Sequence, residues 1–409
     1  MNDIVLQGTE DEERKPHLRI IPFAFYNDST ELAISAAVIA AGYYQPQLAI
    51  VGNAFTSSNG TSSGFLLAKD LQLHNRLFLD TKLLAGDFGE IDSYQDGNPA
   101  FPNERAGSND SHKENFINAE GTDNFYRLNF RYVLPTGDGA KGPIHKYVVD
   151  RRGLLVPGYE SGGREWNPFT SGRLIAEIEF FYRKQELDNV SNQFDPETLG
   201  ATFAFEYDNS DFYKNPSKGS RQRITISHDW GSLDDTAPWT SIDFEASKYF
   251  SFGETDDVQQ RVLALNMWWI DSPTWNSSST INGSEVFHRP PLFSGATLGG
   301  LDRLKGYSTN RFNDRSAVFY AAEYRHMPKN NPFKSIPYIN KLNIPWWQWV
   351  VFAEAGRVHD EWDLSELHDD MKWDAGLGVR LDVEGVVVRL DVAQGEEDTE
   401  VQMFIGHTF

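Results

Sequence analysis

Residues 298–312 read Leu298-Gly299-Gly300-Leu301-Asp302-Arg303-Leu304-Lys305-Gly306-Tyr307-Ser308-Thr309-Asn310-Arg311-Phe312. This stretch is rich in glycine and charge, and it separates two runs, 258–271 and 315–327, in which apolar and polar residues alternate. Alternation with a period of two is typical of β-strands. The stretch is therefore predicted to belong to a long loop between two strands of a sheet.

The composition narrows the class of protein. Aromatic residues make up 13% of the 409 residues, yet the mean hydropathy is −0.50, and no apolar run reaches the roughly 18 residues that a membrane helix needs. A transmembrane β-barrel has such an average because lipid-facing and lumen-facing residues alternate. The formal charge of −22 argues against nucleic acid, whose phosphates bind Lys and Arg. The absence of cysteine excludes disulfides, thiolate nucleophiles and Cys-ligated metals.

Period-two alternation bounded by Gly, Pro, Asn and Asp recurs along the whole chain. The strands that it predicts are 19–28, 31–43, 46–57, 62–72, 75–89, 123–135, 171–186, 199–209, 219–230, 239–252, 258–271, 315–327, 346–358, 371–382, 385–394 and 400–409. An even number of strands puts both termini on one side of a membrane, which is the periplasmic side, where turns are short. The connections 136–170 and 328–345 are longer than this rule predicts. For 136–170 we expect a small hairpin or a segment tucked under the lumen.

The cost of charge in lipid assigns the two faces of each strand. In 373–382, Trp373 and Leu377 share one face, and Asp374 and Arg380 share the other. A Lys or Arg that faces the bilayer centre costs roughly 2–4 kcal/mol, so the charged face should line the lumen. A soluble sandwich shows the same alternation, but its strands usually have about five or six residues. The long strands here favour an all-β, transmembrane antiparallel β-barrel of about 16 strands.

Several motifs resemble one family of such barrels. Lys305-Gly306-Tyr307 resembles the Arg-Gly-Tyr/Phe tip of the long surface loop that folds back into the lumen in the BamA/TamA (bacterial surface antigen) superfamily. Gly299-Gly300 precedes the tip, and a strand that ends Glu323-Tyr324-Arg325 follows it. Other stretches that resemble strands of the family are 205–211 with Pro216 and Gly219, 352–356, 376–380 and 388–393. The resemblance extends from residue 19 to the end of the chain.

The end of the chain resembles the signal by which outer-membrane barrels are recognised for assembly. Met403, Ile405 and Phe409 are its apolar residues, and they are predicted to face outward from the last strand. This implies a contact with the barrel assembly machinery during biogenesis. The seam between strands 19–28 and 400–409 is predicted to be short and weak, because Pro22 cannot donate to a ladder and Gly406 packs no side chain.

Two departures from the family pattern occur together. The family has Arg at the loop tip where this chain has Lys305, and Asp in a later strand where this chain has Glu354. The resemblance implies that these two residues form an ion pair that holds the loop in the lumen. The other lumen ion-pair candidates are Asp374, Arg380 and Asp391. The alternative is that Lys305 is a solvated loop charge.

Two regions are predicted: a tail at 1–18 and the outer-membrane β-barrel domain at 19–409. Relatives carry periplasmic POTRA domains before the barrel, which receive client chains, so the resemblance implies a member without POTRA domains. Residues 1–17 contain no apolar core of a secretory signal. We expect that a signal peptide or N-terminal domain was removed, and the alternative is a chain that is never exported.

The sequence contains only weak matches to enzyme motifs and no clear metal-binding motif. The segment 60–64 reads Gly-Thr-Ser-Ser-Gly and matches G-x-S-x-G, but it is predicted at a hairpin tip, whereas a nucleophile elbow needs a strand, a turn and a helix. The ten His residues are scattered, so no metal site and no cofactor is predicted. The acidic loop 360–363 is read as solvated or as weakly cation-binding. Trp346, Trp347 and Trp349 are read as part of the aromatic girdle of a membrane protein.

The resemblance implies an integral protein of the bacterial outer membrane with periplasmic termini, involved in protein or lipid translocation or assembly. Its expected partners are outer-membrane lipid and lipopolysaccharide. A passive pore or surface-binding barrel is the alternative, and an outer-membrane hydrolase is less favoured. The sequence does not predict a client or an oligomeric state.

Overall fold

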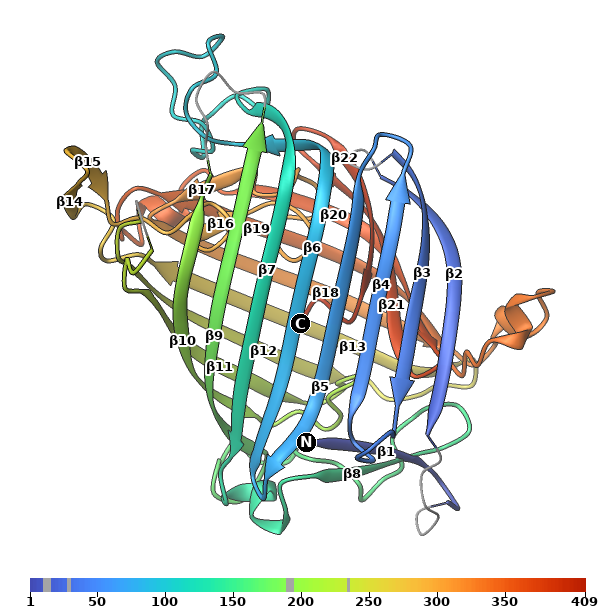
Figure 1. Cartoon of the computed structure of the whole chain (residues 1–409). Coiled ribbons are helices and arrows are strands. Elements are labelled where there is room, and N and C mark those ends of the chain that lie inside the picture. The colour runs from blue at the N-terminus through green and yellow to red at the C-terminus, as the bar shows by residue number, and fades with distance from the viewer. Residues whose placement is uncertain (10–15, 28–30, 189–194, 234–235) are drawn as a thin grey trace.

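The computed structural model describes residues 1–9, 16–27, 31–188, 195–233 and 236–409. Its main feature is a sheet of sixteen strands, each antiparallel to its neighbours, that curves into a barrel (Figure 1). In order around the sheet the strands are β2 (His17–Asn27), β3 (Glu31–Ala41), β4 (Ala49–Ser57), β5 (Ser62–His74), β6 (Leu77–Ser93), β7 (Ile117–Val133), β9 (Arg173–Asp188), β10 (Glu197–Asp208), β11 (Gly219–Asp229), β12 (Trp239–Ser251), β13 (Val258–Asp271), β18 (Ser316–Pro328), β19 (Trp347–His359), β20 (Lys372–Val383), β21 (Val386–Gly395) and β22 (Thr399–Ile405).

Each predicted strand corresponds to one strand of this sheet, in the same order, so the prediction of an all-β barrel is confirmed. The largest difference is in β7, which begins at Ile117 rather than at residue 123, because its ladder with β6 continues as far as the pair Ser93 and Ile117. Residue 28, the predicted end of the first strand, lies outside the described residues.

The two faces of the strands differ as the alternation predicts. Leu377 is 63% exposed on the outer surface of β20, whereas Asp374 and Arg380 of the same strand are fully buried inside the barrel. In β9, Phe180 is exposed and Glu177 is buried. Apolar side chains therefore face lipid, and the charged side chains face the lumen, where ion partners offset the loss of water.

The long connection 136–170 closes one end of the barrel. It contains a short 3-10 helix η1 (Gly137–Lys141) and the strand β8 (His145–Val149), which pairs in parallel with β1 (Asn2–Leu6). Val149 and Leu155 form an antiparallel bridge, and the N–H of Val156 donates to the carbonyl oxygen of Val148 at 2.9 Å, so a small hairpin does form within 136–170. In addition, β1 and β8 lie across the lower end of the barrel in Figure 1, and we refer to these two strands as the floor.

The floor is tied to the barrel wall by hydrogen bonds. The backbone N–H of Asn2 donates to Asp70 Oδ2 at 3.3 Å, and Arg173 Nη1 donates to the carbonyl oxygen of Met1 at 3.2 Å. The predicted tail 1–18 thus contains a strand that contacts the barrel.

The connection 272–315 between β13 and β18 is long and contains two short pairs of strands, and we call it the roof loop. It contains a hairpin of β14 (Ser278–Ile281) and β15 (Ser284–Phe287), which projects away from the barrel in Figure 1. It also contains the pair β16 (Ala296–Leu298) and β17 (Phe312–Asp314), which flank the motif at 298–312.

The remaining helical pieces are short. The stretch 328–345 holds the 3-10 helices η2 (Pro332–Lys334) and η3 (Ile339–Lys341), and η4 (Glu366–His368) lies between β19 and β20. Within the described part of the chain, no helix is both long and apolar enough to cross a membrane.

The end of the chain differs from the prediction. The last strand was expected to extend over 400–409, but β22 ends at Ile405, and the C-terminus lies inside the barrel (Figure 1). Arg325, a buried residue of β18, donates to the carbonyl oxygen of Phe409 at 3.2 Å and lies over its ring. The predicted outward orientation of Phe409 is therefore wrong, because a left-handed φ of 110° at Gly406 breaks the strand before it.

The seam of the barrel lies between β2 and β22, at the two ends of the strand order. Among the described residues no backbone ladder joins these two strands. Near the seam, Arg19 Nε of β2 lies 3.2 Å from Glu384 Oε2 in the turn between β20 and β21. The Arg19 side chain is largely exposed, and such pairs contribute little to stability.

Candidate functional site: the infolded loop and the lumen

The roof loop is folded by its own turns and by an apolar cluster. The N–H of Gly299 donates to the carbonyl of Arg303 at 2.9 Å, and that of Gly300 donates to the carbonyl of Tyr307 at 3.0 Å. Glycine suits both positions because their φ values, 105° and 102°, are rarely adopted by other residues. Leu298, Leu304, Tyr307 and Phe312 pack in one cluster with side chains of β13, β18 and β19. Burying an apolar side chain of this size contributes roughly 1.5–3 kcal/mol.

Lys305 lies at the tip of the loop, inside the barrel, and is fully buried. Its Nζ forms an ion pair with Glu354 Oε1, and its backbone N–H donates to Glu354 Oε2 at 3.0 Å. The Nζ also lies 4.3 Å from the centre of the Phe352 ring, and Gln402 Nε2 donates to the Lys305 carbonyl at 3.0 Å. Side chains of β19 and β22 therefore hold the tip from two directions.

The two residues after Lys305 contact β20. The N–H of Gly306 donates to Asp374 Oδ2 at 2.8 Å, and the Tyr307 hydroxyl donates to the Trp373 carbonyl at 3.1 Å. A Cβ atom at Gly306 would lie 2.5 Å from the backbone nitrogen of Gly395, so the tip requires glycine for close approach. Burial raises the pKa of Tyr307 to about 12, so its hydroxyl remains a proton donor at neutral pH.

A second set of buried charges lies beside the tip. Glu323 accepts from Arg325 Nε at 2.9 Å, and Arg380 Nη1 donates to Asp391 Oδ1 at 2.5 Å. Arg380 Nη2 also lies 3.6 Å from Glu323 Oε1, which links the two pairs. Of the predicted candidates, Lys305 is therefore beside Glu354, Asp374 accepts from the Gly306 N–H, and Asp391 is paired with Arg380.

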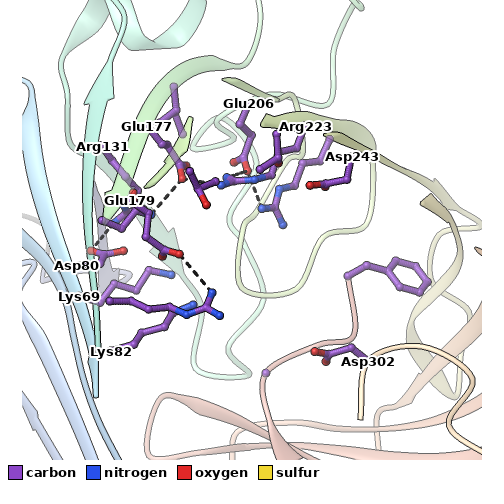
Figure 2. A pocket seen from close by; sticks show the side chains of 18 of the residues that line it. Lys69, Asp80, Lys82, Arg131, Glu177, Glu179, Glu206, Arg223, Asp243 and Asp302 are labelled. Carbon is purple, nitrogen blue, oxygen red and sulfur yellow. Dashed lines mark hydrogen bonds and ion pairs between the residues drawn. The ribbon is translucent and has the colours of Figure 1, made fainter. Parts of the chain in front are cut away.

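Below the roof loop the lumen contains a cavity of about 1000 Å³. Residues of the floor and of the roof loop line its two ends, and the strands from β4 to β13 supply most of its wall. Figure 2 shows that its lining is charged. Arg131 lies 2.6 Å from Asp80, and Arg223 lies 2.8 Å from Glu177 and 3.3 Å from Glu206.

A scan against protein families matches residues 122–409 to the Omp85 superfamily domain. The chain belongs to the Omp85 superfamily. Membership confirms the BamA/TamA relationship that the loop motif predicted and makes this chain an outer-membrane β-barrel of that family.

Solved structures show the same fold in other members of the superfamily. The chain is similar to BamA from Haemophilus ducreyi lacking POTRA domains 1-3, with a TM-score of 0.50 and 10% identity over 96% of this chain and 70% of that one. It is also similar to CdiB from Escherichia coli, with a TM-score of 0.54 and 9% identity over 95% of this chain and 62% of that one. For CdiB from Acinetobacter baumannii the TM-score is 0.48 and the identity 11%, over 95% of this chain and 59% of that one. No curated protein sequence matches the chain.

Some residues that anchor the roof loop of this Omp85 barrel were not predicted from the sequence. Arg311 is fully buried, and its Nε and Nη2 donate to the two carboxylate oxygens of Glu397 at 2.8 and 2.7 Å. Its Nη2 also donates to the carbonyl of Ser111 at 2.5 Å. Arg105 forms an ion pair with Asp314. The position of Arg311 next to Phe312 in the motif was the one available signal, and nothing in the sequence pointed to Glu397 or to the loop after β6.

Met403 and Phe409, two residues of the predicted assembly signal, lie on opposite sides of the barrel wall. Met403 is exposed on the outer face of β22, whereas Phe409 lies in the lumen. The side chain of Ile405 lies outside the described part of the structure. Whether the three act as an assembly signal stays a prediction.

The structure also shows where the G-x-S-x-G segment and the tryptophans of the expected aromatic girdle lie. The segment 60–64 covers the end of the turn after β4 and the first three residues of β5. Trp349 is on the outer face and stacks on His326 at 4.4 Å, as a girdle residue would. Trp346 is fully buried and packs with Met327 and Val387, so its assignment to the girdle is wrong. The physical reason is the strand period, which puts residue 346 on the opposite face from residues 347 and 349.

Proposed function

We propose that this Omp85 barrel takes part in translocating or assembling protein or lipid at the outer membrane, with the roof loop as the element that closes the lumen. The observation that carries the proposal is the tip of the loop, where Lys305 and Gly306 are held by Glu354 and Asp374 inside the barrel. A simple diffusion pore has no need of a buried loop tip held by carboxylates of the wall. Pro22 of β2 cannot donate to a ladder across the seam with β22, which supports a barrel whose wall can open there.

We further infer that residues 1–18 form an N-terminal tail, that 19–409 form the barrel domain, and that both termini are periplasmic. Outer-membrane lipid and lipopolysaccharide would contact the apolar outer face, and the barrel assembly machinery would act on the chain during its own insertion. BamA and CdiB are the relatives from which a role in assembly or translocation is carried over.

The test is a reconstitution. The purified barrel is incorporated into liposomes, an unfolded outer-membrane barrel is added, and its folding is followed by its shift in mobility on unboiled gels. A separate sample measures the exchange of a fluorescent lipid between leaflets. We expect one of these two rates to rise above that of empty liposomes. If both rates equal those of empty liposomes, the proposed role is wrong.

The alternative is a passive pore, and the charged cavity below the roof loop is the observation in its favour. Single-channel recordings in planar bilayers distinguish the two. A barrel closed by the roof loop should give small, flickering currents, and Lys305→Ala should increase the time spent open. A large, steady conductance in the unmodified barrel would favour the pore.

A further inference from the structure

Three cationic side chains share one wall of the lumen cavity. Lys69 of β5, Lys82 of β6 and Arg127 of β7 all line it. In the ladder between β6 and β7, Lys82 is directly opposite Arg127. In the ladder between β5 and β6, Lys82 is opposite Leu67, two residues from Lys69. Figure 2 shows the two lysines on the same side of the cavity.

This arrangement is unfavourable by itself. Like charges directly opposite each other on neighbouring strands destabilise a sheet. Arg127 has a partner, because its Nη1 lies 3.2 Å from Glu179 Oε1. Neither Lys69 nor Lys82 has an ion pair with any residue that the structure describes. The Nζ of Lys69 lies 6.0 Å from the centre of the Tyr213 ring.

The other cations of the cavity are different, because they have carboxylate partners. Arg131 contacts Asp70 and Asp80, Arg223 contacts Glu177, and Lys214 contacts Asp382. Among the described residues of the lining, the positive charge without an ion pair is therefore concentrated at the two lysines.

The lysine side chains and their place in the lumen indicate which kind of anion the site can bind. Lysine ammonium groups are compact point charges and bind phosphate without the planar geometry that arginine imposes. The site lies in the lumen, on the side of the wall that faces away from lipid, and Asp80, Asn129 and Arg131 line the wall around it, which favours a soluble anion over a lipid. We propose that Lys69, Lys82 and Arg127 form a binding site for a soluble, phosphate-bearing anion in the lumen. This site is separate from the tip contacts on which the proposed function rests.

Binding is tested on the full chain in detergent, with pyrophosphate as the probe and calorimetric titration as the measurement. We expect Lys82→Met to weaken pyrophosphate binding about tenfold, and Lys69→Met with Lys82→Met to abolish it. Lys248→Met is the matched control, because Lys248 is exposed on the outer face of β12, and its affinity should be unchanged. Mobility on unboiled gels checks that each variant is folded.

A second measurement does not depend on the ligand. Without any anion, Lys82→Met should raise the temperature of unfolding, because it removes the like charge opposite Arg127.

Three results would overturn the proposal. One is unchanged pyrophosphate affinity in the double variant. Another is complete competition by chloride at the same concentration as pyrophosphate, which marks the site as an ordinary counterion site. The third is binding of dioctanoyl phosphatidic acid but not of pyrophosphate, which would identify a lipid headgroup rather than a soluble anion. None of these measurements involves a client or a membrane, so the proposed function can fail while this site holds.

Discussion

At the scale of single residues, the pair of Lys305 and Glu354 shows how lysine replaces arginine at the loop tip. Arginine can bind both oxygens of a carboxylate with one planar group, and lysine cannot. Here the Lys305 ammonium contacts one oxygen of Glu354, and the backbone N–H of the same residue donates to the other at 3.0 Å. The carboxylate is therefore bound at both oxygens by a single residue of the loop.

The first prediction is that Lys305→Ala loosens the roof loop without unfolding the barrel. A lone member of a buried ion pair costs roughly 3–5 kcal/mol, and water that enters the lumen lowers this cost. Trypsin should cleave the variant near Arg303, a site that the parent protects, and Glu354→Ala should give the same cleavage. The double variant should cost less stability than the sum of the two single variants. Simple additivity would show that the two residues are not coupled.

Gly306 gives a second prediction at this scale. The Cβ of Gly306→Ala would lie 2.5 Å from the Gly395 nitrogen and 2.8 Å from the Asp374 Cβ. Both distances are too short, so the loop tip would have to move away from β20. We expect faster tryptic cleavage of the roof loop and a lower unfolding temperature. Gly64→Ala in β5 is the control, since a Cβ there meets nothing within 4 Å and its φ is not left-handed. Equal protection in both variants would contradict the close approach.

At the scale of elements, the roof loop is anchored to two other connections through Arg311. This side chain joins Glu397, between β21 and β22, to Ser111, in the loop after β6. The third prediction is that Arg311→Lys weakens this anchor, because lysine cannot bind both oxygens of Glu397. Hydrogen exchange should then speed up in 298–312 and in the loop after β6 together. Faster exchange in the roof loop alone would show that Arg311 does not couple the two.

The seam gives the fourth prediction. The ladder of β6 and β7 extends from Leu77 paired with Tyr132 to Ser93 paired with Ile117, whereas β2 and β22 share no ladder among the described residues. Backbone N–H groups of β2 and β22 that face the seam should therefore exchange with solvent much faster than those of β6 and β7. Mass spectrometry of peptides from the four strands measures this. Protection of the seam equal to that of β6 and β7 would contradict an openable wall.

At the scale of the whole molecule, apolar side chains cover the outer face and charged side chains line the lumen. The fifth prediction is that the protein fractionates with outer membranes, needs detergent in solution, and migrates differently on gels before and after boiling. The cause of the last effect is that the folded barrel resists detergent until it is heated. Recovery of a folded monomer without detergent would contradict the membrane assignment.

The sequence by itself determined the sixteen strands, their order and their two faces. The physical reason is that lipid outside and ion pairs inside impose a period of two on each strand, and that period is a local property of the chain. The resemblance at 298–312 added the loop tip and singled out Glu354 as the best partner for Lys305, which the structure places beside it. This part of the candidate site was accessible before the fold was known.

Only the tertiary structure decided the contacts between distant segments. The pairing of β1 with β8, the bond of Arg311 to Glu397 and the inward course of the chain after Gly406 follow no local period. Phe409 was predicted to face lipid because alternation was extended through a glycine that turns the chain. Lys69 and Lys82 each look like ordinary lumen charges in the sequence. Their lack of ion pairs among the described residues depends on which strands surround the cavity, and that is a property of the folded barrel.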